Sequence, residues 1–181
     1  MPTFQKCGPA VTEMANSILC EFPSHKPVLD ARVKIDFLFA YCDRDDAGQP
    51  KNHAIRYRGG RALGVCRKIK LKDRVAGRGD VEITLDGDWW DTASEADQRG
   101  LLDHEMHHIS VEVDSNGKAV TDDITRPKIT MRKHDFEFGW FGIIAARHGK
   151  ASQEVKQATQ MMEQGGQFLF PDFWHAPAGA E

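Results

Sequence analysis

The alternation of apolar and polar residues predicts a chain that mixes helices with short strands. Apolar positions between Pro9 and Glu21 recur at helical spacing, which predicts an amphipathic helix that the following prolines end. Partial alternation over Ala31 to Tyr41 predicts a strand. Ala62 to Leu71 and Val81 to Leu85 have the composition of two further strands. Together these segments predict a small sheet in the first half of the chain.

A helix start follows these strands. The segment Thr92-Ala93-Ser94-Glu95 matches a capping box, in which we expect the Thr92 hydroxyl to satisfy an exposed backbone donor. The helix is expected to continue to about Ile109, with Leu102, Met106 and Ile109 on one side. That side is expected to anchor the helix in the core.

In the second half of the chain, the sequence pattern predicts short strands and two more helices. Asn116-Gly117 is a turn signal between two strand-like pieces in Val111 to Val120. The remaining elements are expected at Lys128 to Arg132 (a strand), from near His134 until Gly149 (a strong helix), and at Ser152 to Glu163 (a third helix).

This order of elements predicts a single α+β domain at residues 1–166, with its core at about 31–149. We expect a small, mostly antiparallel sheet packed against the helix that ends near Ile109 and against the helix that begins near His134. Residues 167–181 form a tail rich in aromatic side chains, and we expect part of it to pack.

Composition narrows the class of protein. The chain has 181 residues, of which 40% are hydrophobic and 28% charged, as in a soluble domain with a full core. It has no apolar run long enough for a bilayer and no secretory signal pattern, so we expect a cytoplasmic protein with no membrane partner. The four cysteines lack a Cys-x-x-Cys pair and are expected to be buried thiols.

The charge distribution is uneven, although the net charge is only −3. Residues 56–78 carry nine arginines and lysines against the single acid Asp73. Such a stretch is either a solvated sheet face or a surface for nucleic acid or an acidic protein. If nucleic acid binds, we expect contacts from Arg67, Lys68 and Lys70.

His104 and His108 are the strongest candidate functional residues. They are four positions apart on a predicted helix, so their imidazoles project about 40° apart and one turn along. Two imidazoles in this arrangement can bind one zinc ion at roughly 2.0–2.1 Å. Glu105, on the flank of the pair, is placed to act as the general base of a His-Glu-x-x-His site.

Residues next to His104 and His108 in the sequence are expected to support the metal site. Asp103 is expected to orient an imidazole of the site through its second nitrogen. His107 projects to the other flank, where we expect it to be structural or to support a ligand without binding the metal itself. Zinc enzymes use three protein ligands and keep one position open. We rank His134 first as third ligand, because it shares a face of its predicted helix with Phe138, Phe141 and Ala145, then Asp135, then Glu137.

The chain resembles a known family at these positions. Residues 101–108 (LLDHEMHH), 134–138 (HDFEF) and 146–149 (ARHG), with 79–85 (GDVEITL) before them, resemble the putative phage metallopeptidase family over roughly Val33 to Gly149. His134 with Phe138 is more distantly similar to the third-ligand helix of SprT-like zinc proteases. The resemblance implies a zincin-like fold, with His104, His108 and His134 as ligands and Glu105 as base. If phage-encoded, the protein would act in the cytoplasm of a bacterial host.

The leading hypothesis is therefore a Zn²⁺ metallopeptidase acting on a protein or peptide substrate, with Glu105 taking a proton from zinc-activated water. An extended substrate is expected to pair with the strand Val81 to Leu85. Lys133, Tyr41 and Tyr57 are candidates for stabilising the oxyanion. The alternative is a nucleic-acid-associated zinc protein, or a DNA-tethered protease, that uses residues 56–78. The oligomeric state and the substrate are left open.

Overall fold

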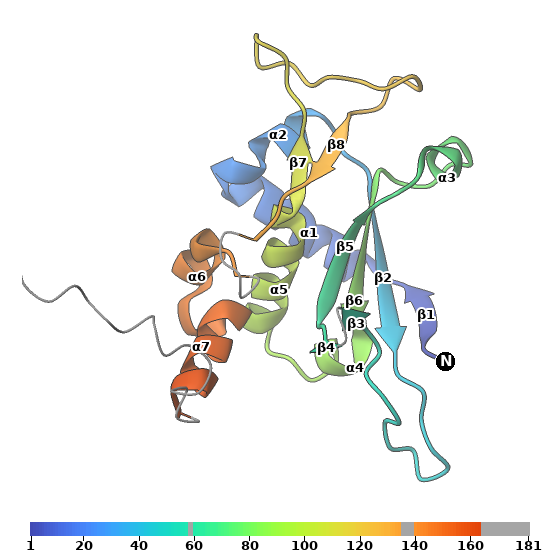
Figure 1. The fold of residues 1–181 in the computed structure, drawn as a ribbon, viewed down its shortest axis with the longest axis vertical. Coiled ribbons are helices and arrows are strands. Elements are labelled where there is room, and N and C mark those ends of the chain that lie inside the picture. The colour runs from blue at the N-terminus through green and yellow to red at the C-terminus, as the bar shows by residue number, and fades with distance from the viewer. Residues whose placement is uncertain (58–59, 135–139, 164–181) are drawn as a thin grey trace, which may run out of the picture.

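A four-stranded sheet with helices on one face organises the chain, as Figure 1 shows. The computed structural model describes residues 1–57, 60–134 and 140–163. Its strands are β1 (Thr3–Lys6), β2 (Ile35–Tyr41), β3 (Arg56–Tyr57), β4 (Gly60–Arg61), β5 (Gly64–Lys68), β6 (Val81–Asp86), β7 (Ile109–Val111) and β8 (Ile129–Met131). Its helices are α1 (Pro9–Glu21), η1 (Pro23–His25), α2 (Lys26–Asp30), α3 (Leu71–Val75), α4 (Gly87–Trp90), α5 (Glu95–His107), α6 (Gly142–His148), η2 (Gly149–Ala151) and α7 (Gln153–Glu163).

The sheet has the order β1-β2-β6-β5. β2 and β6 are parallel, whereas β1 pairs with β2 and β5 pairs with β6 in antiparallel fashion. Two short ribbons, β3–β4 and β7–β8, lie outside this sheet. The expected α+β class with a small, mostly antiparallel sheet is confirmed. The strand expected to dock a substrate, β6, is interior and has both edges occupied, so that prediction is wrong.

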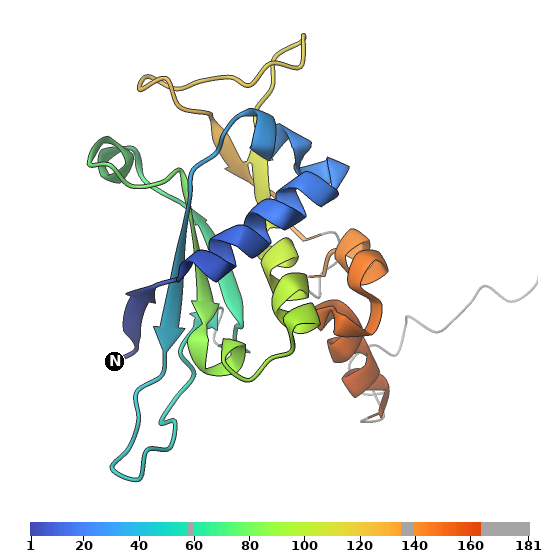
Figure 2. The same cartoon turned by 180° about the vertical axis from the view of Figure 1, so that it is seen from behind.

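The core lies between β6 and two helices that cover it. Val81, Ile83 and Leu85 of β6 are fully buried, as are Leu102 and Met106 of α5. Fully burying an aliphatic side chain of this size stabilises the fold by about 1.5–3 kcal/mol. In the view of Figure 2, α1 crosses in front of the sheet and α5, and α5 lies between the sheet and the α6–α7 pair. The helix α5 is therefore held on several sides.

The N-terminus of α5 is capped differently from the prediction. Ser94, rather than Thr92, is the N-cap, and its hydroxyl oxygen accepts a hydrogen bond from the backbone N–H of Asp97 at 3.2 Å. Thr92 instead donates its hydroxyl to the carbonyl of Trp89 at 3.1 Å. α4 ends at Trp90, so Thr92 lies in the turn between two helices and only Ser94 meets the first free donors.

Two other predicted elements change. The strand expected from Ala31 begins at Ile35, because the short helix α2, with Pro27 in its first turn, ends only at Asp30 and Arg32 has a positive φ of 50°. The Asn116-Gly117 turn exists, with Gly117 at φ 78°, but its flanks form only the isolated bridge Val113 to Ala119. The strand β7 pairs with β8 instead.

The predicted helix from His134 to Gly149 is also shorter. His134 lies in a non-helical segment after β8, and α6 begins only at Gly142. Phe141 is the N-cap of α6 and has an extended backbone. Residues 135–139 lie outside the described ranges, as does the aromatic tail whose packing was predicted. The third helix, α7, covers Gln153–Glu163 as expected.

The state of the cysteines and the length of the helices can be compared with the predictions from composition. All four cysteines are free thiols; Cys42 is buried and Cys7 and Cys66 are half-buried. Cys20 is exposed on α1, so the expectation of burial is wrong for it. In the part of the chain that the structure describes, no helix combines the length and apolarity needed to cross a membrane.

Candidate metal centre

Three histidines meet at one point beside α5. His104 projects from α5, His108 is its C-cap, and His134 follows β8. One ring nitrogen from each lies within 4.8 Å of those of the other two. The Nε2 atoms of His104 and His134 are 3.2 Å apart. His108 keeps helical backbone angles (φ −65°, ψ −21°), so the four-residue spacing still aligns it with His104.

The second nitrogens of the two α5 histidines are held by hydrogen bonds. His104 Nδ1 lies 2.5 Å from Oε1 of Glu154 on α7, a carboxylate that is 2% exposed. His108 Nδ1 lies 2.8 Å from the carbonyl oxygen of Arg132. When each Nδ1 carries the proton and donates it, the lone pair of Nε2 faces the point where the histidines meet.

Hydrogen bonds between Arg132 and His108 bring His134 to the site. The Arg132 backbone N–H donates to the carbonyl of His108 at 2.7 Å, so His108 and Arg132 are joined by two hydrogen bonds. His134 is two residues further along the chain, and its ring centroid lies 4.6 Å from that of His108. The continuation of β8, rather than a helical stripe, therefore positions His134.

The three imidazoles are placed where they could hold one metal ion. Nitrogens bound at 2.0–2.1 Å to a tetrahedral zinc are about 3.3 Å apart, close to the 3.2 Å between His104 and His134. Burial lowers the pKa of His108 to about 4, with His104, His134 and Arg132 adding to the effect and the Arg132 carbonyl opposing it. His108 is therefore a neutral imidazole near pH 7, as a metal ligand must be. Three protein donors leave a coordination position for water or substrate.

Glu105 lies beside this cluster and is 4% exposed. Burial raises the pKa of its carboxyl to about 7; His104 lowers it, Glu154 raises it, and the backbone amide of Cys66 lowers it. Its side chain occupies the space that a side chain at Gly64 on β5 would need, since a Cβ there would lie 2.6 Å from Oε1. A carboxyl with a pKa near neutrality, held at a cleft, has the properties of a general base.

Phe141 supports the histidines from one side. It is fully buried, and its ring centroid lies between 4.7 and 5.0 Å from those of four histidines. These four are His104, His107, His108 and His134. The sequence placed Phe141 on the same stripe as His134, and the structure keeps that proximity although both residues lie outside a helix.

Asp103 is not bonded to any of the three candidate ligand histidines. Its Oδ1 lies 2.6 Å from His25 Nε2 and its Oδ2 lies 2.8 Å from His148 Nε2, while Arg147 donates to both oxygens at 3.0 Å. Burial opposes ionisation, but the hydrogen bonds from the two histidines hold the pKa of Asp103 well below its usual range. Because Asp103 is on the core side of α5, it joins η1 and α6 to that helix, and the role predicted for it falls to Glu154.

His107 is also a supporting residue, as predicted. Its Nε2 lies 2.6 Å from Nη1 of Arg132, which must donate to it. Burial and the nearby Arg132 lower the pKa of His107 to about 3, so the ring is neutral. The lower-ranked ligand candidates Asp135 and Glu137 lie outside the described residues, and their ligand role stays a prediction.

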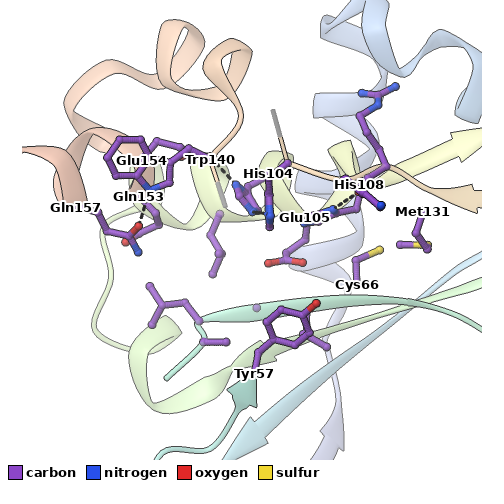
Figure 3. A pocket seen from close by; sticks show the side chains of 18 of the residues that line it. Tyr57, Cys66, His104, Glu105, His108, Met131, Trp140, Gln153, Glu154 and Gln157 are labelled. Carbon is purple, nitrogen blue, oxygen red and sulfur yellow. Dashed lines mark hydrogen bonds and ion pairs between the residues drawn. The ribbon is translucent and has the colours of Figure 1, made fainter. Parts of the chain in front are cut away.

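A cleft of about 670 Å³ opens in front of the histidines (Figure 3). Tyr57 and the chain from Arg61 to Cys66 line one wall, facing Glu105 on α5. Trp140, which donates to the Gln157 amide at 2.7 Å, closes one end, and Met131 lies beside Cys66 at the other. Of the oxyanion candidates, Lys133 and Tyr57 line the cleft. Tyr41 instead packs against Gly87, where it fills the space of a side chain.

Carboxylates neutralise part of the basic stretch 56–78. Three of its arginines form ion pairs: Arg61 with Asp86, Arg74 with Asp80 and Asp122, and Arg78 with Glu82 and Asp36. The residues predicted to contact nucleic acid, Arg67, Lys68 and Lys70, are exposed. Nucleic-acid binding by these three stays a prediction.

Sequence signals could have found some of the residues that were missed. Glu154 is an acidic residue within the predicted third helix, but the sequence does not indicate which residue it contacts. Gly64 lies within a predicted strand, where a glycine often marks a close approach of another group.

Comparison with known proteins assigns the chain to a protein family. No curated protein and no solved structure matches it. The family model described as putative phage metallopeptidase matches residues 5–164, which include the three histidines, Glu105 and Glu154. The chain therefore belongs to the putative phage metallopeptidase family, whose description indicates a metal-dependent hydrolase of peptide bonds.

Proposed function

We propose that the protein is a zinc-dependent peptidase in which His104, His108 and His134 bind the ion and Glu105 is the general base. The observation that carries the proposal is the convergence of three ring nitrogens within 4.8 Å. The bonds of His104 to Glu154 and of His108 to Arg132 support it, because they fix ring orientations that suit metal binding. All three imidazoles are half-buried, so a cleft-bound ion would keep a solvent-accessible side.

The acid–base properties of Glu105 support its role. When bound, zinc would lower the pKa of a water molecule and polarise the carbonyl of a substrate. Glu105 would accept the proton of that water at its carboxylate and then deliver it to the leaving amine. Its contact with Gly64 holds the carboxylate at the wall of the cleft, next to the histidines. A base whose pKa lies near the working pH transfers protons efficiently in both directions.

The sheet edge at the cleft supports a peptide as substrate. β5 is an edge strand, and Gly64, Val65 and Cys66 of this strand line the cleft. An extended peptide that pairs with the free edge of β5 would place its main chain in front of Glu105. Strand β5 thus takes the docking role that the sequence assigned to β6. Tyr57 and Lys133 are on the cleft walls, where either could donate to an oxyanion.

The test is the Glu105→Gln variant of the full chain, loaded with zinc. We expect its zinc content, measured by elemental analysis, to equal that of the wild type, because no ligand changes. Cleavage of an unfolded protein such as casein should fall at least about 10²-fold, the usual scale for loss of a general base. Glu95→Gln, at the exposed start of the same helix, is the matched control and should keep full activity.

Two outcomes would contradict the proposal. Wild-type activity in Glu105→Gln would remove Glu105 as the base. A wild-type protein that binds no zinc, or that binds zinc and cleaves no protein or peptide, would remove the peptidase assignment.

A further inference from the structure

The cleft wall formed by β3 to β5 carries positive charge without any acid. From Lys51 to Lys72 the sequence contains eight lysines and arginines and no aspartate or glutamate. This segment includes the edge strand β5, along which the proposed substrate lies. The charged side chains that this segment offers to a substrate strand at its edge are therefore all positive.

The cations at and just beyond the C-terminal end of β5 form no ion pairs with described residues. Among the described residues, Arg67, Lys68 and Lys70 form no ion pair, whereas Arg61, Arg74 and Arg78 do. All of the first three are exposed. An exposed lysine on an edge strand is available to a carboxylate on a neighbouring strand.

Strand geometry places Lys68 on the cleft side of β5. Alternate residues of a strand share a face, so Gly64, Cys66 and Lys68 point the same way. Gly64 touches Glu105, and Cys66 lines the cleft beside Met131. Lys68 therefore lies about 7 Å beyond Cys66, and about 13 Å beyond Gly64, along the same edge.

The cleft lining includes a further exposed cation from outside this segment. Lys133 is exposed, lines the cleft, and precedes the ligand His134. It also forms no ion pair within the described ranges. The acids that line the cleft are Glu105, which is assigned to the chemistry, and Glu154, which is bonded to His104.

We infer that the peptidase prefers acidic substrates, with Lys68 contacting an Asp or Glu side chain two to four residues from the bond that is cleaved. This rests on the proposed function. The spacing follows from the distance between Gly64, next to the base, and Lys68. A peptide fits this arrangement better than a nucleic acid, because the cations follow the free main-chain edge of a strand that can pair with another strand.

The preference is tested on the zinc-loaded full chain with a mixed library of peptides, identifying the cleaved bonds by mass spectrometry. Asp and Glu should be enriched on one side of the cleaved bond. Paired peptides that carry Glu or Gln at the enriched position should differ about 5-fold in kcat/KM, the upper range for an exposed ion pair. The difference should shrink in 0.5 M NaCl, where the Debye length is shorter.

Two charge reversals then locate the contact. Lys68→Glu should abolish or invert the ratio between the Glu and Gln peptides. Lys72→Glu makes the same change at an exposed residue of α3, outside the edge strand β5, and should leave the ratio as in the wild type. Both variants change exposed residues, and thermal unfolding verifies that each is folded.

The outcomes separate this inference from the proposed function. Cleavage with no preference for acids, or equal ratios in Lys68→Glu and Lys72→Glu, overturns the acidic preference and leaves the peptidase assignment standing. Binding of DNA that Lys68→Glu removes, together with no acidic preference, assigns these cations to nucleic acid and also overturns it. No cleavage of any peptide by the zinc-loaded chain defeats both.

Discussion

Replacing Gly64 with alanine tests the position of Glu105, the proposed general base, without changing that residue or any of the three candidate ligand histidines. The added Cβ would lie 2.6 Å from Oε1, 2.7 Å from Cγ and 2.8 Å from Cδ of Glu105. An ordinary contact begins at 3.4 Å, so the Glu105 side chain must move by about 0.8 Å or more. Rotating the carboxylate alone does not relieve the clash, because Cγ is also too close.

The expected result is a loss of activity with little loss of structure. A misplacement of about 1 Å at a reacting group costs about 10²-fold, so kcat/KM of Gly64→Ala should fall by about that factor. Zinc content should stay at the wild-type level, because all three histidines are unchanged. Gly64 does not have a positive φ, so the penalty to the free energy of unfolding is that of local overpacking, about 1–3 kcal/mol.

The assay measures kcat/KM on a peptide that the wild type cleaves, with zinc content and thermal unfolding measured on the same samples. Gly60→Ala is the matched control on the neighbouring strand β4. Its nearest neighbour would be the Tyr57 carbonyl at 3.8 Å, an ordinary contact, so activity should stay within about twofold. Wild-type kcat/KM in Gly64→Ala would refute the reasoning, since it would show that Glu105 does not act from this position.

Two further predictions concern residues that support the site. Glu154→Gln should weaken zinc binding about 10–100-fold in a chelator competition, because the neutral amide holds His104 Nδ1 less firmly; zinc affinity equal to the wild type would contradict this. For Asp122, burial raises the pKa, but hydrogen bonds from Arg126, Ile124 and Arg74 outweigh it, so the pKa lies below 3.8. This carboxylate therefore stabilises the fold above pH 3.8 and less as pH falls below it. Asp122→Asn should cost about 1–3 kcal/mol in chemical unfolding at pH 7, with a gap that narrows in acid; a constant gap would argue against the ionic contribution.

The sequence predicted what depends on neighbours along the chain. The bounds of α1 match the prediction, because its apolar spacing and the flanking prolines are local signals. The projection of His104 and His108 to one side of α5 depends only on helical geometry. Their neighbour Glu105 was expected on the flank of the pair, and it lies at the cleft wall there.

What the sequence could not predict depends on segments that are distant in the chain. Gly64 meets Glu105 because β5 pairs with β6 as the last strand of the sheet, and no local pattern fixes the order of strands. The same long-range order makes β5 an edge strand and β6 an interior strand of the described sheet. Glu154 meets His104 across 50 residues, through the packing of α7 against α5.

His134 was ranked as the third metal ligand because of a predicted helix that does not form at this residue. Its predicted helix would have aligned it with Phe138 and Phe141, but it precedes α6 and lies in a non-helical segment. It still reaches the other two histidines, because Arg132 is joined to His108 by a backbone hydrogen bond and by a second one between its carbonyl and the His108 ring. The chemistry of the residue and its distance from β8 were better guides than the expected helix.

The origin of these contacts implies that metal binding depends on tertiary structure. His104 is held by α7 through Glu154, and His108 is held by the continuation of β8 through Arg132. The isolated α5 helix would present two imidazoles, but with neither second nitrogen fixed and without His134. Because the complete donor set requires three separate segments to be docked, zinc that binds only the folded chain adds its binding free energy to folding. The orientation of the proposed ligands and the packing of the C-terminal helices therefore both contribute to the folding equilibrium of the zinc-bound chain.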